Sequence, residues 1–366
     1  MSMGQIVVVG GYGNAGREIV RLLLEHTEEP LVVAGRDLSR AQRLVDTLGG
    51  DRVGARRVDV THPASLREAL GEASVLIVAA GTSADWRVSV EAALDTGCHQ
   101  LDIQIGSAKN AGLRAMDTQV RDAGVSVITD CGFHPGVPAA MVRLVAGQMP
   151  DLSMAVVTSW IGINWRELGP FSDSTVAEMV SEFADYRYEA LVGGRWQAPK
   201  GTREVVFPEP FGRQKVAAMG LDEMRAVAAE VPTLTETGFY VGGFPAPVNY
   251  GVIPVVYAGM KAAPKLSARP LGHLLDWGLR TFSRPPYGTV LQLDAASGGR
   301  PARPVLRLSH TDGYLLTAAP VVATVQQLLT GATRPGVHLQ GMYVEPTAFF
   351  SDVAAMGVHL WRAPTS

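Results

Sequence analysis

Short apolar runs alternate with amphipathic segments along the first third of the chain. The apolar runs have the length and the Val, Ile, Leu and Ala content of buried strands, and they cover residues 5–10, 31–34, 55–60, 75–79, 100–103 and 125–129. The segments between them repeat apolar residues at helical spacing and predict helices over residues 17–26, 39–48, 63–70, 84–96 and 113–123. Strands that alternate with helices predict an α/β fold in which a parallel sheet carries helices on both faces.

This alternation is lost in the middle of the chain, between about residues 135 and 314. The middle region predicts strands over residues 154–158, 203–207, 289–293 and 305–309, and helices over residues 138–148, 174–184 and 222–229. Such a mixture is typical of an α+β domain inserted into a parallel fold. We therefore predict three parts: a cofactor domain (1–134), a substrate or dimerisation domain (135–314) and a C-terminal segment (315–366) that returns to the cofactor domain.

A glycine-rich turn follows the first predicted strand. Residues 11–16 spell G-x-G-x-x-G, and an amphipathic helix comes directly afterwards. In this motif Gly11 permits a tight turn, Gly13 allows the backbone to approach a pyrophosphate, and Gly16 allows the helix to pack on the strand. The N–H groups at the helix N-terminus then face the phosphates. The motif in this context predicts a Rossmann-type doubly wound sheet that binds a dinucleotide.

The end of the second predicted strand distinguishes between the two nicotinamide cofactors. An acidic residue at this place would bind the ribose 2′-hydroxyl of NAD, but the chain has Arg36 here, followed by Ser39 and Arg40. A guanidinium and a hydroxyl near a helix N-terminus suit the 2′-phosphate of NADP. NADP(H) is therefore the predicted cofactor. The nearby Asp37 keeps NAD(H) as the less favoured alternative, and Arg36 and Arg40 are equally compatible with ordinary solvated helix charges.

Other strand ends complete the predicted cofactor site, because ligands bind at the carboxyl ends of the strands in such sheets. Residues 59–60 are predicted to lie beside the adenine, and residues 80–82 and 131–132 beside the nicotinamide. The complete set of predicted cofactor-binding residues is Gly11, Gly13, Asn14, Ala15, Gly16, Arg36, Ser39, Arg40, Asp59, Val60, Ala80, Gly81, Thr82, Cys131 and Gly132.

Three stretches resemble the NADP-binding domain of the saccharopine dehydrogenase family. They are G-G-Y-G-N-A-G at residues 10–16, A-L-D-T-G-C-H-Q-L-D-I at residues 93–103 and D-C-G-F-H-P-G-V-P at residues 130–138. The segment 317–357 also resembles family members, in which the chain returns to pack helices on the cofactor domain. The resemblance implies an NADP-dependent oxidoreductase whose substrate is an amino-acid-derived imine. The middle region is shorter than in saccharopine reductases, and no saccharopine-binding set is recognisable there.

Three residues are candidates for the proton transfer that accompanies hydride transfer. His134 titrates near neutral pH as a free side chain and could relay a proton to a reduced carbonyl or imine, or it could only pack at the domain junction. Asp102 closes a predicted strand and could orient a donor, bind a substrate amine or cap a turn. Tyr250 is a candidate acid or a buried core tyrosine. Lys215 could pair with a substrate carboxylate or be an ordinary solvated lysine.

Composition and charge restrict the class of partner. The formal net charge of −3 gives no indication of nucleic-acid binding, and the two cysteines, Cys98 and Cys131, form neither a disulfide framework nor a metal pattern. No signal peptide is recognisable, so we predict a cytoplasmic protein, and a homodimer, that acts on a small molecule. The segment 261–307 carries eight Lys/Arg and two Asp. Its amphipathic helix could lie on a membrane, cover an apolar substrate, or pack on a neighbouring sheet or subunit.

These features predict an oxidoreductase that transfers a hydride between nicotinamide and a carbonyl or imine carbon of a small metabolite. Two alternatives stay open at this point: a carbonyl reductase of an apolar secondary metabolite, and an NADP-binding regulatory or scaffold protein without turnover.

Overall fold

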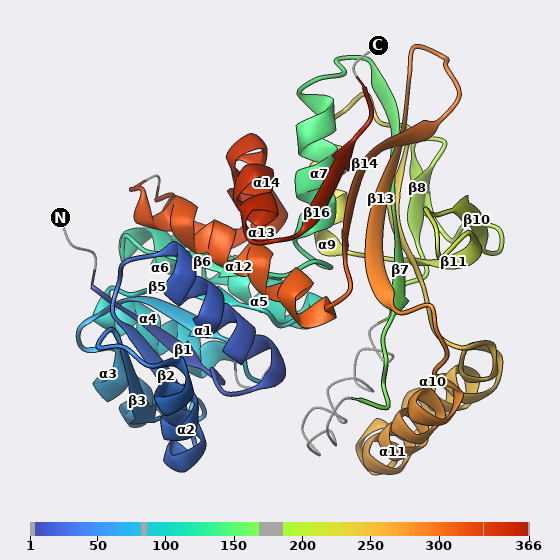
Figure 1. The fold of residues 1–366 in the computed structure, drawn as a ribbon. Coiled ribbons are helices and arrows are strands. Elements are labelled where there is room, and N and C mark those ends of the chain that lie inside the picture. The colour runs from blue at the N-terminus through green and yellow to red at the C-terminus, as the bar shows by residue number, and fades with distance from the viewer. Residues whose placement is uncertain (1–3, 82–85, 168–185, 332, 365–366) are drawn as a thin grey trace. The chain divides into compact units, whose positions relative to one another are not determined.

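The chain forms two compact units in the computed structural model, which describes residues 4–81, 86–167, 186–331 and 333–364 (Figure 1). The first unit comprises residues 1–140 and 314–358, and the second comprises residues 141–313 and 359–366. The helix that joins them, α7 (Val137–Ala146), contains the boundary.

A parallel sheet forms the centre of the first unit, in the strand order β15-β6-β5-β4-β1-β2-β3. Its strands are β1 (Gln5–Val9), β2 (Leu31–Gly35), β3 (Val53–Arg57), β4 (Ala73–Val78), β5 (His99–Asp102), β6 (Ser126–Thr129) and β15 (Gly336–Leu339). The order reverses between β1 and β4, where the chain first moves outward in one direction and later in the other. This reversal is the switch point of a doubly wound sheet, so the predicted fold class is confirmed.

Helices cover both faces of this sheet (Figure 1). The helices of this unit are α1 (Asn14–His26), α2 (Leu38–Leu48), α3 (Pro63–Leu70), α4 (Trp86–Thr96), α5 (Ser107–Ala115), α6 (Asp117–Asp122), α12 (Gly313–Leu329), α13 (Gln340–Tyr343) and α14 (Pro346–Ala355). The prediction of one helix over residues 113–123 is wrong. The helical segment begins earlier, at Ser107, and divides at Met116, whose φ of −95° and ψ of 0° leave the helical region.

A mixed sheet forms the centre of the second unit, in the order β10-β11-β12-β7-β13-β14-β16. Only β12 and β7 are parallel among these described pairs. The strands of this unit are β7 (Leu152–Gly162), β8 (Ala190–Val192), β9 (Arg195–Gln197), β10 (Arg203–Val206), β11 (Arg213–Met219), β12 (Glu236–Gly242), β13 (Gly288–Ser297), β14 (Arg303–His310) and β16 (His359–Arg362). Strand β16, close to the C-terminus, therefore belongs to this sheet and not to the first one.

The strands predicted for the middle region correspond to β7, β10, β13 and β14, and the helix α9 (Asp222–Glu230) was also predicted. The predicted helix 174–184 lies outside the described residues. Strands β8, β9, β11 and β12 were not predicted, because they are short or have too few consecutive apolar residues to stand out.

A helical hairpin follows β12 in the second unit. It consists of a short π-helix, η2 (Val248–Val252), then α10 (Ile253–Ala262) and α11 (Pro264–Phe282). The apolar face predicted around residues 271–282 packs inside this hairpin, where buried residues of η2, α10 and α11 form one cluster. The partner of that face is therefore a neighbouring helix of the same chain. Among the described residues, no helix has the length and the apolar character needed to span a membrane.

Candidate functional site

The glycine-rich turn joins β1 to α1 at the switch point of the first sheet. The left-handed position belongs to Gly10, whose φ is +79°, and not to Gly11, to which the sequence analysis assigned the tight turn. A Cβ on Gly16 would lie 2.1 Å from the carbonyl oxygen of Gly10, so α1 packs directly on the turn. A Cβ on Gly13 would lie 3.1 Å from the same oxygen. The turn therefore keeps the helix N-terminus, with its free N–H groups, accessible to an anion.

The end of β2 lies beside this turn. Arg36, Ser39 and Arg40 are all exposed at the start of α2. Asp37 is the N-cap residue of this helix, and its Oδ1 accepts a hydrogen bond of 3.0 Å from the backbone N–H of Arg40. Its carboxylate thus already satisfies a helix donor, while the guanidinium groups beside it face solvent.

Tyr12, which was not among the predicted cofactor-binding residues, connects the glycine-rich turn to the end of β2. Its hydroxyl accepts a hydrogen bond of 3.1 Å from the backbone N–H of Asp37. The guanidinium of Arg40 lies 4.8 Å from the centre of its ring, in a cation–π contact. A Cβ on Gly35 would lie 2.5 Å from the ring, which explains why glycine occurs there. Tyr12 therefore holds Arg40 next to the place predicted for the ribose.

The other predicted cofactor residues lie at neighbouring strand ends. The carboxylate of Asp59 accepts hydrogen bonds from the N–H and the hydroxyl of Thr61, and these bonds lower the pKa of Asp59. Val60, the next residue, is buried.

Two predicted residues lie at the start of α1. Asn14 donates from Nδ2 to the Tyr314 hydroxyl at 3.1 Å, and Ala15 lies in the first turn of the helix. At the end of β4, the backbone of Ala80 is next to that of Gly10, and Gly81 is exposed. Thr82 lies outside the described residues.

A buried lysine links the ends of β5 and β6. The Nζ of Lys109 lies 2.5 Å from Oδ1 of Asp102 and 3.7 Å from Oδ1 of Asp130, and it also donates to the carbonyl of Gln104. The exposed fractions are 3% for Lys109 and 2% for each aspartate, so all three charges are removed from water. We call Asp102, Lys109 and Asp130 the buried triad. Buried ions need close partners of opposite charge and further hydrogen bonds, and Thr129 and the backbone N–H of Gln104 also donate to Asp102.

Hydrogen bonds around the triad connect two loops that were predicted to lie near the nicotinamide. The Nε2 of Gln104 donates to the carbonyl of Ala80 at 2.7 Å, which ties the loop after β5 to the loop after β4. The backbone N–H of Cys131 donates to the carbonyl of Asp102 at 2.9 Å. Asp130 itself has a φ of +56°, a left-handed backbone conformation that is uncommon outside glycine. Its Oδ2 accepts a hydrogen bond of 2.8 Å from Asn110, the residue after Lys109.

Gln340 of the C-terminal segment fixes the loop 131–136. Its side chain accepts from the N–H of Gly132 at 3.2 Å and donates to the carbonyl of the same residue at 3.1 Å. A Cβ on Gly136, whose φ is +116°, would lie 2.4 Å from Gln340 Nε2. The loop is therefore held from one side by β5 and from the other by the segment that returns to the first unit.

Burial changes the chemistry of two candidates on this loop. It lowers the pKa of His134 to about 4, so the imidazole is neutral at pH 7. The prediction that His134 titrates near neutral pH is therefore wrong. Burial, with the nearby charge of Asp102 as a smaller cause, raises the pKa of the Cys131 thiol. Cys131 is thus a protonated, buried thiol at neutral pH.

The other two proton-transfer candidates have contrasting surroundings. Asp102 does contact an amine, but this amine is Lys109 of the same chain, and the aspartate is buried. Tyr250 belongs to the second unit, where it is 68% exposed on η2, so it is not a core residue. Sequence reasoning missed Lys109, Gln104, Gln340 and Tyr12. The available signal was a strand ending in Asp with Lys and Asn a few residues later, but nothing in that pattern indicates burial.

A doubly wound sheet with a glycine-rich turn at its switch point is the architecture of a domain that binds NAD or NADP. Residues 6–128 match the family described as the saccharopine dehydrogenase NADP-binding domain. The first unit therefore contains a domain of this family, as the sequence resemblance predicted.

Solved structures extend the similarity of fold to the whole chain. Saccharopine dehydrogenase (L-Glu forming) from Saccharomyces cerevisiae superposes with a TM-score of 0.69 at 14% sequence identity, covering 98% of this chain and 100% of that one. Homospermidine synthase from Legionella pneumophila, solved in complex with NAD, superposes with a TM-score of 0.61 at 10% sequence identity, covering 99% of this chain and 92% of that one. At such identities the similarity defines the fold, with an NAD(P)-binding unit and a second unit built on a mixed sheet.

Proposed function

We propose that this protein is an NADP(H)-dependent oxidoreductase that acts on a carbonyl or imine carbon of a small metabolite. The observation that carries the proposal is the glycine-rich turn at the switch point, beside the ends of β2 and β4. When bound there, the cofactor supplies or accepts a hydride at the nicotinamide. Membership of the first unit in a dehydrogenase domain family supports the same class of reaction.

The residues at the turn fit a dinucleotide. Gly16 brings α1 into direct backbone contact with the turn, and the lack of a side chain on Gly13 leaves the N-terminus of α1 open. Backbone N–H groups in the first helical turn would bind the pyrophosphate, since they have no acceptor within the helix. The N-cap residue, Gly13, has no side chain that could compete for them.

The end of β2 supports NADP(H) over NAD(H). Arg36 occupies the place where an acidic residue would bind the ribose hydroxyls, and Arg40 is held nearby by Tyr12. The one acidic group in this turn, Asp37, is occupied as a helix cap. Two guanidinium groups and the Ser39 hydroxyl suit a phosphate, which accepts charge-assisted hydrogen bonds.

The double variant Arg36→Gln/Arg40→Gln tests this preference. We expect its Kd for NADPH to rise by about 10- to 100-fold, because each lost charge-assisted contact contributes about 1.4 kcal/mol. The Kd for NADH should change by less than about threefold, since NADH has no 2′-phosphate. Isothermal titration calorimetry with both cofactors measures the two effects.

Arg43→Gln is the matched control, because Arg43 is an exposed arginine on the same helix and outside the predicted site. It should bind both cofactors as the wild type does. Equal losses for NADH and NADPH in the double variant would contradict the assignment of these arginines to the 2′-phosphate.

The buried triad has a positioning role in this proposal. Lys109 neutralises part of the charge of two aspartates at the ends of β5 and β6, and thereby fixes the loop 131–136 that we place at the nicotinamide. His134 lies on this loop, but its neutral imidazole has no extra proton to give at pH 7. The proton for the reduced product is therefore better supplied by solvent or by the substrate than by His134.

Turnover assays distinguish the substrate classes. We expect oxidation of NADPH, followed at 340 nm, with 2-keto acids in the presence of amines, since an imine forms from that pair. Oxidation with ketones or aldehydes and no amine would instead identify a carbonyl reductase. Saturable NADPH binding without turnover across both panels would contradict an enzymatic function and favour the non-catalytic alternative.

A further inference from the structure

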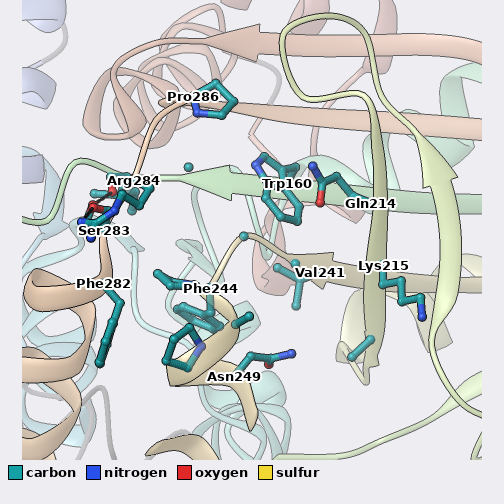
Figure 2. Close-up of a pocket in the computed structure, with 18 of the residues that line it drawn as sticks. Trp160, Gln214, Lys215, Val241, Phe244, Asn249, Phe282, Ser283, Arg284 and Pro286 are labelled. Atoms are coloured by element: carbon teal, nitrogen blue, oxygen red, sulfur yellow. Dashed lines mark hydrogen bonds between the residues drawn. The ribbon is translucent and has the colours of Figure 1, made fainter. Parts of the chain in front are cut away.

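The second unit contains a cavity of about 700 Å³ that the proposed function does not use. It lies where the ends of β7, β11 and β12 meet η2 and the segment after α11 (Figure 2). Cavities of about 300–1,000 Å³ are typical of sites for small molecules. Every residue that lines it belongs to the second unit, so the cavity is separate from the proposed cofactor turn of the first unit.

Much of the lining is aromatic or apolar. Figure 2 shows Trp160 and Phe244 facing the middle of the cavity, with Val241 and Phe282 nearby. A pair of glycines shapes this surface. Gly243 has a φ of +122°, and a Cβ on it would lie 2.2 Å from the carbonyl oxygen of Ile161, while a Cβ on Gly242 would lie 3.2 Å from the Trp160 ring. The backbone of β12 therefore passes close to β7 and leaves the indole ring as part of the lining.

The charged side chains of the lining are mostly basic. Arg213 is paired with Glu204, the acidic residue of the lining, so these two charges compensate each other. Lys215 and Arg284 have no carboxylate partner among the residues that the structure describes. In the view of Figure 2 they lie on opposite sides of the aromatic residues. The cavity thus combines an apolar body with an excess of two positive charges.

From this combination we infer that the cavity binds an organic anion with an apolar body, such as an aryl-substituted carboxylate. The aromatic rings would cover the body of the ligand, and Lys215 or Arg284 would face its carboxylate. Positive charge without an internal counter-ion favours an anion over a neutral or cationic ligand of the same shape. The inference concerns a ligand site in the second unit and goes beyond the proposed NADP(H) chemistry.

Two probes that differ only in charge test the inference on the full-length protein. We expect 4-phenylbutyrate to bind about tenfold more tightly than 4-phenylbutyramide, as measured by isothermal titration calorimetry without cofactor. Acetate, which has the charge without the apolar body, should bind at least about tenfold more weakly than 4-phenylbutyrate. In the variant Lys215→Met/Arg284→Met, the preference for the carboxylate over the amide should fall to about one.

The control variant, Arg195→Met/Lys200→Met, removes the same number of charges from exposed positions of the same unit that do not line the cavity. It should keep the tenfold preference. The inference is wrong if 4-phenylbutyrate does not bind the wild type, if the amide binds equally well, or if the preference survives in Lys215→Met/Arg284→Met. Because Lys215 and Arg284 are exposed, Lys215→Met/Arg284→Met should keep the melting temperature of the wild type. An unchanged melting temperature would exclude misfolding as the cause of a lost preference for the carboxylate. Binding of NADPH to the same samples reports separately on the cofactor proposal.

Discussion

Replacing Lys109 by methionine is expected to lower the free energy of unfolding of the protein by about 3–5 kcal/mol. The methionine has a similar length but no charge, so Asp102 and Asp130 would stay buried without their ammonium partner. A buried charge that loses its partner is strongly destabilising because water cannot replace the lost interaction. Urea unfolding followed by circular dichroism measures the change.

Two comparisons isolate the cause of this effect. The triple variant Lys109→Met/Asp102→Asn/Asp130→Asn removes all three charges and should regain part of the lost stability. Lys200→Met removes a lysine from an exposed position and should change stability by less than about 0.5 kcal/mol. A loss of less than about 1 kcal/mol in Lys109→Met would show that the ion pairs contribute no more than surface pairs do.

Replacing Gly16 by alanine is expected to weaken NADPH binding by at least about 100-fold, a loss of about 2.7 kcal/mol. The new Cβ would lie 2.1 Å from the carbonyl oxygen of Gly10 and 2.8 Å from the Gly11 backbone. These contacts are with backbone atoms, which cannot move aside as a flexible side chain can. The N-terminus of α1 must therefore shift from the turn, and the N–H groups proposed to bind the pyrophosphate shift with it. Calorimetric titration with NADPH gives the change in Kd.

Gly54→Ala is the matched control for this variant. Gly54 belongs to β3 of the same sheet, and a Cβ there meets no atom within 4 Å. This variant should bind NADPH with the wild-type Kd. Equal NADPH affinities for Gly16→Ala and Gly54→Ala would show that the turn does not hold the cofactor. Circular dichroism of both proteins shows whether a loss of affinity comes from a local shift or from unfolding.

The sequence pattern was sufficient for six of the seven strands of the first sheet and for the place of its glycine-rich turn, whereas β15, which the C-terminal segment adds beside β6, was not predicted. Strands β1, β2 and β4 are continuous apolar runs because both faces of a parallel sheet are buried, and helices such as α1 repeat their apolar residues at helical spacing. The glycine motif is a local signal, since the turn and the helix that it requires are adjacent in the chain. The arginine at the end of β2 was recognisable for the same reason.

Several features of the candidate site depended on contacts that no local pattern contains. Lys109 is buried because the ends of β5 and β6 come together around its side chain. Gln340 contacts the loop 131–136 although it is more than 200 residues away in the chain. His134 was predicted to titrate near neutral pH because a free imidazole does so, but burial inside the fold lowers the pKa of His134. The amphipathic face of α11 was visible in the sequence, whereas its partner, α10, was not.

The sequence by itself therefore determined the alternating strands and helices around the cofactor turn, the glycine-rich turn and the basic end of β2, because each arises from residues that are neighbours in the chain. Only the tertiary structure decided the buried triad, the protonation of His134 and the meeting of basic and aromatic side chains around the cavity in the second unit. The free energy of a charged group depends on its distance from water and from other charges, and folding sets both distances.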